Sequence, residues 1–307
     1  LFSLEISYNV KKEEVTTIEH TYLQLRFAGF TTSMIKQLLT AYPDFPQLSF
    51  QEQLILLNEE QVLSKRSYKE EYKANYIRLT EDYMFSKLAE WQVNVLSIED
   101  DEYPQLLKEI YDPPYILFYR GNLHMLNRPR KLAIIGSRSA TYYTTQTLES
   151  FFPHFDRADL TIVSGLAKGA DHVAHRLSLR YNMSSIGVLG FGHLAHYPYE
   201  TQSTRDLLEY QGLTISEYVP DTRPQRYYFP QRNRLISGLA QGIFVTEAEQ
   251  NSGTHITTTA ALEQNREVYI LPGSIFNPMT RGNMLSAQDG AKIVLEPSDI
   301  ISDFEIY

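Results

Sequence analysis

Hydrophobic positions recur at two different spacings along this chain of 307 residues, and the change of spacing divides it into two parts. In the first part, up to about Trp91, apolar residues follow a helical spacing. Thr31 and Thr32, for example, precede apolar side chains at positions 34, 35, 38 and 39, as an N-cap precedes an amphipathic helix. Pro43 and Pro46 are expected to end this helix, because proline cannot donate a helical hydrogen bond.

Two further segments of the first part also read as helices. They cover Glu52–Leu63 and Tyr68–Leu88 and are rich in Glu, Lys and Leu. Gly29 is the only glycine before Gly121, which is typical of helical sequence because glycine destabilises helix interiors.

The second part of the chain alternates short β-branched runs with amphipathic segments. After a turn-rich adapter over Val93–Leu126, which contains a short apolar strand at Tyr115–Tyr119, the predicted strands are Leu132–Ile135, Leu160–Val163, Ile186–Leu189, Leu213–Ile215, Ile243–Val245, Val268–Leu271 and Ile293–Leu295. Strands that alternate with helices of about ten residues indicate a parallel sheet with helices on both faces.

The boundary between the two parts lies near residues 90–95, where Gly-poor helical sequence gives way to strands and glycines. We predict an all-helical domain over residues 1–92 and an α/β domain over residues 93–307. The first dozen or so residues are left out of the fold prediction, because a chain that begins with Leu1 instead of Met can carry residues added by cloning.

The residues that follow the predicted strands are rich in Gly, Ser, Thr, Lys and Arg. These loops are Gly136–Arg138, Ser164–Asp171, Gly190–His193, Glu247–Thr254 and Pro272–Ser274. Glycine lets backbone N–H groups approach an anion, and a helix that follows points its positive end at the same space. A single glycine loop is more often a plain turn, but five loops at successive strand ends favour a phosphate-binding site.

The established phosphate-binding motifs do not match these loops. Gly-x-Gly-x-x-Gly is absent from the first turn, and no acidic residue stands about 20 positions beyond it to hold a ribose. The Gly165–Asp171 loop lacks the Gly-Lys-[Ser/Thr] step of a Walker A motif. A nicotinamide dehydrogenase and a P-loop nucleotide hydrolase are therefore not expected.

Charge is segregated along the chain although the net charge is −9. Residues 113–148, 172–199 and 222–246 contain no carboxylate. Buried strands explain part of this, but they do not explain the arginines of Arg223–Arg234, which alternate with aromatic residues. Guanidinium groups that bind phosphates beside rings that stack on bases suit single-stranded nucleic acid. Alternatively Tyr227, Tyr228 and Phe229 anchor a helix in the core, as we expect for one or two of the three.

The chain contains no cysteine, which excludes a disulfide framework, a cysteine nucleophile and thiolate metal sites. This composition fits a reducing cytoplasm. No apolar run approaches the roughly 20 residues needed to cross a bilayer, and the N-terminus has no signal-peptide pattern. We expect a cytoplasmic protein without membrane contact.

Taken together, these motifs resemble those of the DprA/Smf family (DNA-processing protein A). The similar segments are Ile135–Arg138, Val163–Asp171 with His175, Phe229-Pro230, Arg232–Leu239, Glu247-Ala248, Ser252–Thr254, Pro272–Ser274 and Gly290–Lys292, with a similar lead-in at Tyr103-Pro104, Asp112–Pro114 and Tyr119–Asn122. The resemblance covers residues 95–295, and its motifs are specific in combination rather than singly.

This resemblance implies a small helical, SAM-like N-terminal domain and an extended Rossmann-like domain with a mostly parallel, doubly wound sheet. It implies a homodimer that binds single-stranded DNA without sequence specificity, protects incoming DNA in natural transformation and loads the RecA recombinase. It implies no enzyme activity, no catalytic residue, no cofactor and no metal.

The resemblance also assigns the DNA contacts by motif position. Phosphate contacts would come from Arg138, Lys168, Arg232 and Arg234. The backbone and hydroxyl groups around them would come from Gly136, Ser137, Ser164, Gly165, Gly169, Asn233, Ser252, Gly253 and Thr254.

The sequence departs from the family pattern in two places. Lysine is common after the Tyr-Pro that follows the third strand, but Tyr199 stands here, which weakens any lysine contact at that position. Asn265 stands where the family often has glycine. We expect no winged-helix domain, which some family members lack, because the chain ends at Tyr307.

The main alternative is a nucleotide glycohydrolase of the lysine-decarboxylase-like (LOG) class, with Glu247 and Glu263 as acids and Arg266 as a clamp. That class is expected to contain Pro-Gly-Gly-x-Gly-Thr, of which this chain keeps only part. A metal hydrolase is a weaker alternative: His172 and His175, and likewise His193 and His196, are spaced as ligand pairs, but such histidines more often pack or cap. A serine hydrolase lacks its Gly-x-Ser-x-Gly motif.

Overall fold

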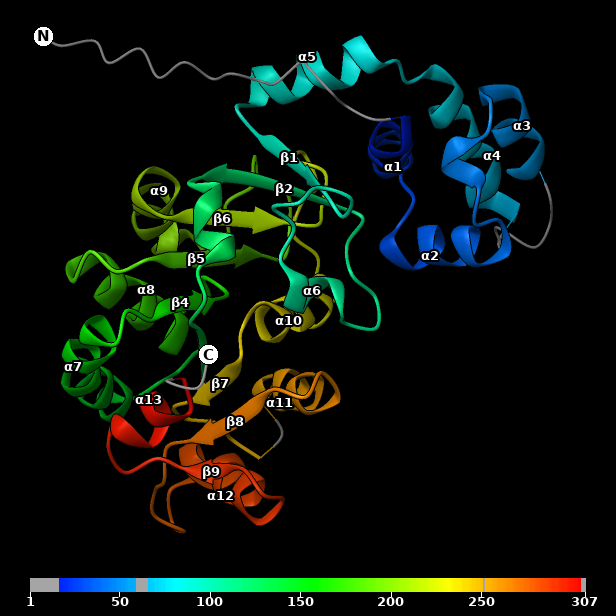
Figure 1. Cartoon of the computed structure of the whole chain (residues 1–307). Coiled ribbons are helices and arrows are strands. Elements are labelled where there is room, and N and C mark those ends of the chain that lie inside the picture. The colour runs from blue at the N-terminus through cyan, green and yellow to red at the C-terminus, as the bar shows by residue number, and fades with distance from the viewer. Residues whose placement is uncertain (1–16, 59–65, 251, 305–307) are drawn as a thin grey trace, which may run out of the picture. The chain divides into compact units, whose positions relative to one another are not determined.

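The computed structural model describes residues 17–58, 66–250 and 252–304 (Figure 1). It contains two compact units, one made of residues up to 100 with 114–118 and the other of residues 101–113 with 119–307. The N-terminal residues set aside above, the end of the helix predicted over Glu52–Leu63, and Asn251 lie outside the described residues.

The first unit is helical, as predicted. Its elements are α1 (Thr17–Ala28), α2 (Thr32–Ala41), the short 3₁₀ turn η1 (Phe45–Gln47), α3 (Phe50–Leu56), α4 (Arg66–Arg78), α5 (Glu81–Trp91), strand β1 (Asn94–Ser97) and the start of β2 (Ile116–Gly121). Thr31 is the N-cap of α2, and its hydroxyl accepts a hydrogen bond from the backbone N–H of Met34. The predicted break after α2 is confirmed by η1, which has Pro46 in its first turn.

One predicted helix of this unit is two helices. The segment Tyr68–Leu88 is interrupted after Arg78, and α5 begins at Glu81 with Thr80 as its N-cap. The Thr80 hydroxyl accepts from the backbone N–H of Tyr83, which satisfies a donor that would otherwise be free at the new helix end. β1 was not predicted either, because only Val95 and Leu96 of its four residues are apolar and it lies within the turn-rich adapter.

The second unit is built on a parallel sheet. Seven of its strands lie in the order β6-β5-β4-β3-β7-β8-β9, and every pairing between them is parallel. They are β3 (Lys131–Ile135), β4 (Thr161–Ser164), β5 (Ser185–Leu189), β6 (Leu213–Ser216), β7 (Gly242–Val245), β8 (Glu267–Ile270) and β9 (Lys292–Ile293). The seven strands predicted after the adapter are all present, although the last, predicted over Ile293–Leu295, is the two-residue β9 and shares only Ile293 with the prediction.

Helices cover both faces of this sheet (Figure 1). They are α7 (Tyr142–Arg157), α8 (Ala170–Arg180) and α9 (Gln202–Gln211) on one face, and α10 (Tyr228–Leu239) and α11 (Thr254–Glu263) on the other. The remaining elements are α6 (Gln105–Lys108), η2 (Leu123–Asn127), η3 (Tyr199–Thr201), η4 (Pro278–Thr280), α12 (Arg281–Gln288) and α13 (Ser298–Phe304).

The core explains why the central strands are mostly apolar. Leu132 and Ile134 of β3 are fully buried against Phe152 and Phe155 of α7, while Ala133, which points the other way, is also fully buried. A sheet covered on both faces requires this pattern. The doubly wound, Rossmann-like fold predicted from the sequence is thereby confirmed. Among the described residues, every helix is too short or too polar to cross a bilayer.

The strand order places a ligand crevice beside β3. The chain winds outward from β3 through β4 and β5 to β6, and then returns through α10 to β7 on the other side of β3. In folds of this kind, ligands bind at the carboxyl ends of the strands where the winding direction reverses. The loops after β3, β4 and β7 meet at this point.

Candidate nucleic-acid interface

A hollow of about 130 Å³ lies at the carboxyl ends of the central strands. Its lining residues are Arg138, Gly165, Leu166, Ala167, Lys168, Tyr197, Pro198, Phe229 and Arg232. They come from the loops after β3 and β4, from the connection between β5 and α9, and from α10. The structure therefore brings together four residues predicted as DNA contacts, namely Arg138, Gly165, Lys168 and Arg232.

Arg138 is one of two exposed cations that line this hollow. Its guanidinium carbon lies 5.5 Å from the centre of the Phe229 ring, and it has no ion pair within the described part of the chain. The loop that holds it is fixed, because the N–H of Ser137 donates to the Glu247 carbonyl at 2.7 Å and the Ser137 hydroxyl accepts from the Ser139 N–H. A fixed loop with a free guanidinium is suited to hold a phosphate.

The loop after β4 is held by its own carboxylate. Asp171, which is buried, accepts hydrogen bonds from the backbone N–H groups of Gly165 at 3.1 Å and Ala167 at 3.4 Å. The N–H group of Gly165, which was predicted to cradle a phosphate, is thus satisfied within the protein. Burial raises the pKa of Asp171, and the positive charge of Arg232 partly opposes this shift.

Gly169 and Ser164 also have structural roles in this loop. Gly169 has a φ of +74°, and a Cβ there would lie 2.2 Å from the carbonyl oxygen of Ser137. Only glycine allows the loops after β3 and β4 to approach so closely. The buried hydroxyl of Ser164 donates to the Ile134 carbonyl at 2.6 Å. Lys168 is exposed at the outer end of the loop and forms an ion pair with Glu200.

Arg232 forms the floor of the hollow. It is 3% exposed, and its Nη1 donates to the carbonyl of Gly165 at 2.6 Å and to that of Val188. Its Nε donates to the side chain of Asn233 at 3.2 Å. Burial lowers the pKa of Arg232 to about 10, so the side chain remains a cation at neutral pH. Its positive charge therefore lies directly below the hollow and makes the hollow more favourable for an anion.

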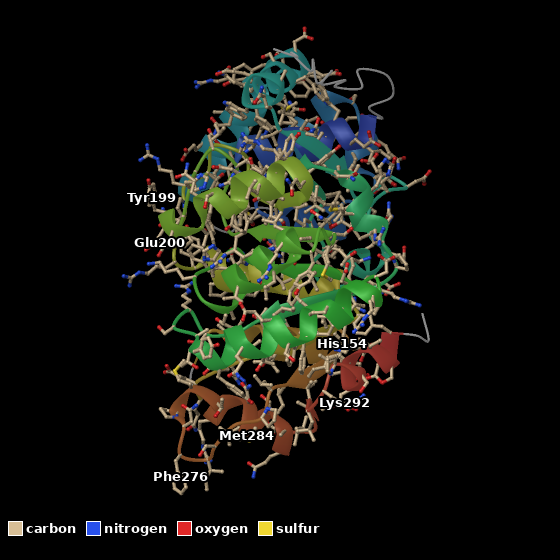
Figure 2. All side chains as sticks on the ribbon, turned by 90° about the vertical axis from the view of Figure 1, so that its left-hand side faces the viewer. His154, Tyr199, Glu200, Phe276, Met284 and Lys292 are labelled. Atoms are coloured by element: carbon tan, nitrogen blue, oxygen red, sulfur yellow. The ribbon has the colours of Figure 1, made fainter. Side chains whose placement is uncertain are left out.

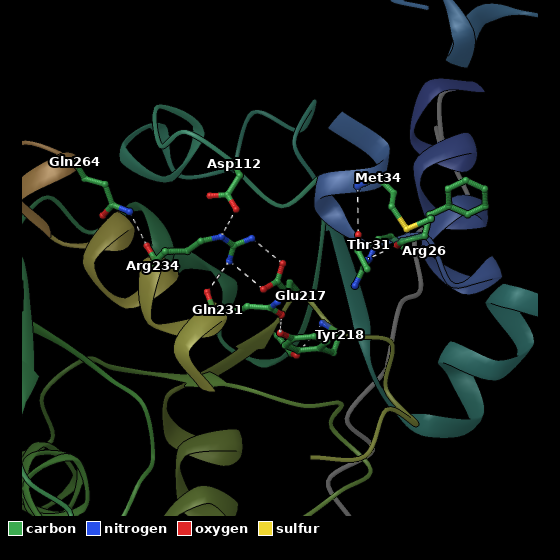
Figure 3. Close-up of polar contacts among 11 residues, drawn as sticks. Arg26, Thr31, Met34, Asp112, Glu217, Tyr218, Gln231, Arg234 and Gln264 are labelled. Carbon is green, nitrogen blue, oxygen red and sulfur yellow. Dashed lines mark hydrogen bonds and ion pairs between the residues drawn. The ribbon is translucent and has the colours of Figure 1, made fainter. Parts of the chain in front are cut away.

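Arg234 lies apart from the hollow. Figure 3 shows its guanidinium between Asp112 and Glu217, at 2.8 Å from Asp112 and 2.8 and 3.0 Å from the two Glu217 oxygens. Burial tends to lower the pKa of Arg234, but the two carboxylates outweigh it and the pKa is raised. The sequence did not reveal this cluster, because both acids are distant from Arg234 along the chain.

Aromatic rings surround the hollow at different depths. Phe229 is half-buried and lies 5.5 Å from the ring of Tyr197, while Tyr228 packs on Tyr218 with ring centres 4.2 Å apart. Tyr227 is 59% exposed. This division agrees with the expectation that one or two of residues 227–229 are anchors. Tyr197, which is 47% exposed, was missed as a lining residue, although an aromatic residue after a glycine-rich strand end is a usable signal.

Glu247 occupies the N-terminus of α7, where dinucleotide-binding folds hold a pyrophosphate. Its carboxylate accepts hydrogen bonds from the N–H of Thr141 at 2.7 Å, the hydroxyl of Thr141 at 2.8 Å and the hydroxyl of Thr144 at 2.7 Å. Glu247 is fully buried. Gly136 faces the same strand end, since a Cβ there would lie 2.4 Å from the Thr246 hydroxyl.

The predicted residues Ser252, Gly253 and Thr254 lie at the start of α11 and do not line the hollow. Gly253 is exposed, Thr254 is buried, and the buried Ser252 hydroxyl has no hydrogen-bond partner among the described residues.

Three of the four spaced histidines pack within the second unit, whereas His196 is exposed. His172 contacts the Thr204 hydroxyl at 2.9 Å, His175 contacts the Ser185 hydroxyl at 2.9 Å, and His193 lies 3.4 Å from the Thr214 carbonyl. Burial lowers the pKa of His175 to about 3 and that of His193 well below its ordinary value. No group of three or more metal-ligating side chains occurs in the part of the chain that the structure describes.

Comparison with known proteins gives the same family as the motifs. The model of the DNA recombination-mediator protein A family matches residues 94–305. The DNA processing protein DprA of Streptococcus pneumoniae is 41% identical over 209 residues, which are 68% of this chain and 73% of the relative. The DprA protein of Bacillus subtilis is 39% identical over 211 residues, 69% of this chain and 71% of the relative.

Solved structures agree with this result. The X-ray structure of Streptococcus pneumoniae DprA has a TM-score of 0.83 at 32% identity and covers 96% of this chain and 100% of its own. The structure of Helicobacter pylori DprA, described for its single-stranded DNA binding mode, has a TM-score of 0.63 at 26% identity and covers 70% of this chain and 96% of its own. The chain belongs to the DNA recombination-mediator protein A family, which includes the DprA and Smf proteins.

Proposed function

We propose that this protein binds single-stranded DNA without sequence specificity at the hollow around Arg138 and Phe229, and that it protects incoming DNA in natural transformation. The observation that carries the proposal is the exposed, unpaired guanidinium of Arg138 beside the half-buried Phe229 ring. A cation for the backbone and a ring for a base are the two elements of single-strand recognition.

The contacts that we propose differ in kind. Arg138 and Lys168 are exposed and reach the DNA backbone directly, whereas Arg232 contributes charge from the buried floor. Tyr197, whose ring lies 5.5 Å from that of Phe229, and Tyr227 offer exposed ring surface. The duplex hides its bases, so rings at this hollow favour a single strand.

We propose that the protein is not an enzyme. The glycohydrolase alternative needs Glu247 as an acid, but this carboxylate is fully buried and accepts three hydrogen bonds from the start of α7. A carboxylate engaged in this way is not available to protonate a leaving group. No observation favours a second function.

The remaining proposals rest on the family. By analogy with its relatives, we propose that the protein acts in the cytoplasm as a homodimer, loads the RecA recombinase on the bound strand, and uses residues 1–92 as a separate SAM-like domain.

Competition binding tests the proposal. A labelled single strand of mixed sequence is bound to the protein at low salt, and unlabelled single strand or duplex is then added. We expect unlabelled single strands of unrelated sequence to compete equally and duplex to compete poorly. Equal competition by duplex, or release of free base from a nucleoside monophosphate, would contradict the proposal.

A further inference from the structure

Glu200 is the acidic residue that faces the proposed DNA site. Its carboxylate forms an ion pair with Lys168, one of the two exposed cations of the hollow, and the two side chains are 56% and 50% exposed. Figure 2 shows Glu200 next to Tyr199 at one margin of the second unit. Glu200 belongs to η3, which directly follows the lining residues Tyr197 and Pro198.

The three cations of the hollow have different partners. Arg138 has no ion pair within the described residues, and Arg232 is engaged with backbone carbonyls. Of the three, Lys168 is the one that forms an ion pair with a carboxylate among the described residues. The hydrogen bond from Lys168 lowers the pKa of Glu200, so this carboxylate is ionised at neutral pH.

We propose that Glu200 occupies the place of a DNA phosphate at Lys168 and thereby sets the affinity of the site for single-stranded DNA. A carboxylate bonded to an ammonium group imitates a backbone phosphate in charge and in acceptor geometry. A strand that contacts Lys168 must displace Glu200, which then remains close to the incoming phosphate as a like charge. This inference rests on the proposed function, because it assigns a role within the same site.

The pair is suited to be exchanged rather than to stabilise the fold. Both side chains are exposed, and ion pairs of this kind contribute little to stability because water and salt screen them. η3 and the connection before it remain fixed without this pair, since the Thr201 N–H and hydroxyl both bond the Pro198 carbonyl, at 3.2 and 3.0 Å. Glu200 can therefore release Lys168 without unfolding its segment.

The test compares Glu200→Gln with a matched control. Glu263→Gln removes the same charge from an exposed position at the last residue of α11. Because α11 runs from the end of β7 to the start of β8, Glu263 lies toward the amino ends of the strands, away from the hollow. We expect Glu200→Gln to bind oligo-dT about threefold to tenfold more tightly at low salt, since one exposed pair no longer competes. We expect Glu263→Gln to change the affinity by less than about twofold.

Two further readouts connect the effect to Lys168. The slope of log affinity against log salt should steepen by up to about 0.7 in Glu200→Gln, because Lys168 then pairs only with DNA. In a Lys168→Ala background, Glu200→Gln should increase the affinity for oligo-dT by less than about twofold, because the lysine with which Glu200 pairs is missing.

The outcomes separate the two proposals. If the wild-type protein binds oligo-dT but Glu200→Gln binds no better than Glu263→Gln, the role of Glu200 is overturned and the proposed function stands. If Glu200→Gln binds more weakly than wild type, Glu200 supports the DNA-bound state instead, which also overturns this inference. If the wild-type protein does not bind oligo-dT at low salt, both proposals fail together.

Discussion

Gly165 and Arg232 are in direct contact: the Arg232 Nη1 donates to the Gly165 carbonyl at 2.6 Å, and a Cβ on Gly165 would lie 2.5 Å from Nη2. The absence of a side chain at position 165 is therefore what allows the guanidinium to lie beneath the hollow. Gly165 therefore has a structural role in the site, because it leaves the space in which the Arg232 guanidinium lies.

We expect Gly165→Ala to displace Arg232 and to lower the free energy of unfolding by about 1–3 kcal/mol, the usual effect of overpacking a buried position. Urea unfolding followed by circular dichroism measures this. Gly253→Ala is the control, since Gly253 is exposed, and we expect a change within about 0.5 kcal/mol. Equal stability of wild type and Gly165→Ala would show that Arg232 is not held where the structure places it.

Arg234 and Arg138 should respond differently to truncation. Arg234→Ala removes the guanidinium that pairs with the buried Glu217 carboxylate, so we expect a loss of about 3 kcal/mol in the free energy of unfolding. Arg138→Ala removes an exposed side chain without an ion pair among the described residues, and we expect its stability to remain within about 0.5 kcal/mol of wild type. Thermal unfolding of both variants measures the contrast. A stable Arg234→Ala that binds DNA with a weaker salt dependence would return Arg234 to the DNA contacts.

The strands of the parallel sheet could be predicted from the sequence for a definite physical reason. Strands buried on both faces are apolar over most of their length, and this property is visible in β3, β4 and β7 without any knowledge of tertiary contacts. The break between α4 and α5 was missed because both segments favour helix and only Leu79 and the N-cap Thr80 separate them.

The site could be predicted only in part. Glycine and cation positions after β3 and β4 were visible in the sequence, and the structure brings Arg138, Lys168 and Arg232 to one hollow. The partners of these groups could not be predicted, because Glu217 and Asp112 reach Arg234 only through the fold. The same holds for Glu247, whose three hydrogen bonds come from residues more than 100 positions away.

Replacement of an exposed aromatic residue and of a packed one should have different effects on stability and on DNA binding. Tyr227 is 59% exposed, so we expect Tyr227→Ala to keep its melting temperature. If its ring stacks on a base, the variant loses about 1–3 kcal/mol of single-strand binding. Phe229→Ala should lose both binding and stability, because Phe229 packs against the buried cluster that contains Leu166 and Phe191. Unchanged binding by Tyr227→Ala would remove this ring from the DNA path.

His175 should make stability depend on acidity. Burial lowers its pKa to about 3 in the folded protein, against an unfolded value of about 6.5. The folded state therefore excludes a proton that the unfolded state binds, so the stability is complete above pH 6.5 and is lost as the pH falls toward 3. The expected slope is about 1.4 kcal/mol per pH unit well below 6.5.

The check is to measure the free energy of unfolding of wild type and His175→Asn between pH 8 and pH 4. We expect the difference between the two to narrow steadily below pH 6.5, because the variant lacks this titration. His124→Asn, at an exposed position, is the control and should follow wild type. Parallel curves for wild type and His175→Asn would contradict the buried, neutral state of His175.

The most direct test of the central claim, that Arg138 holds a backbone phosphate of single-stranded DNA, is fluorescence anisotropy of labelled poly-dT over a salt series with wild type and Arg138→Ala. We expect tight, salt-sensitive binding by wild type, and weaker binding by the variant with a slope of log affinity against log salt that is smaller by about 0.7. Absence of wild-type binding at low salt, or identical slopes for the two proteins, would contradict it.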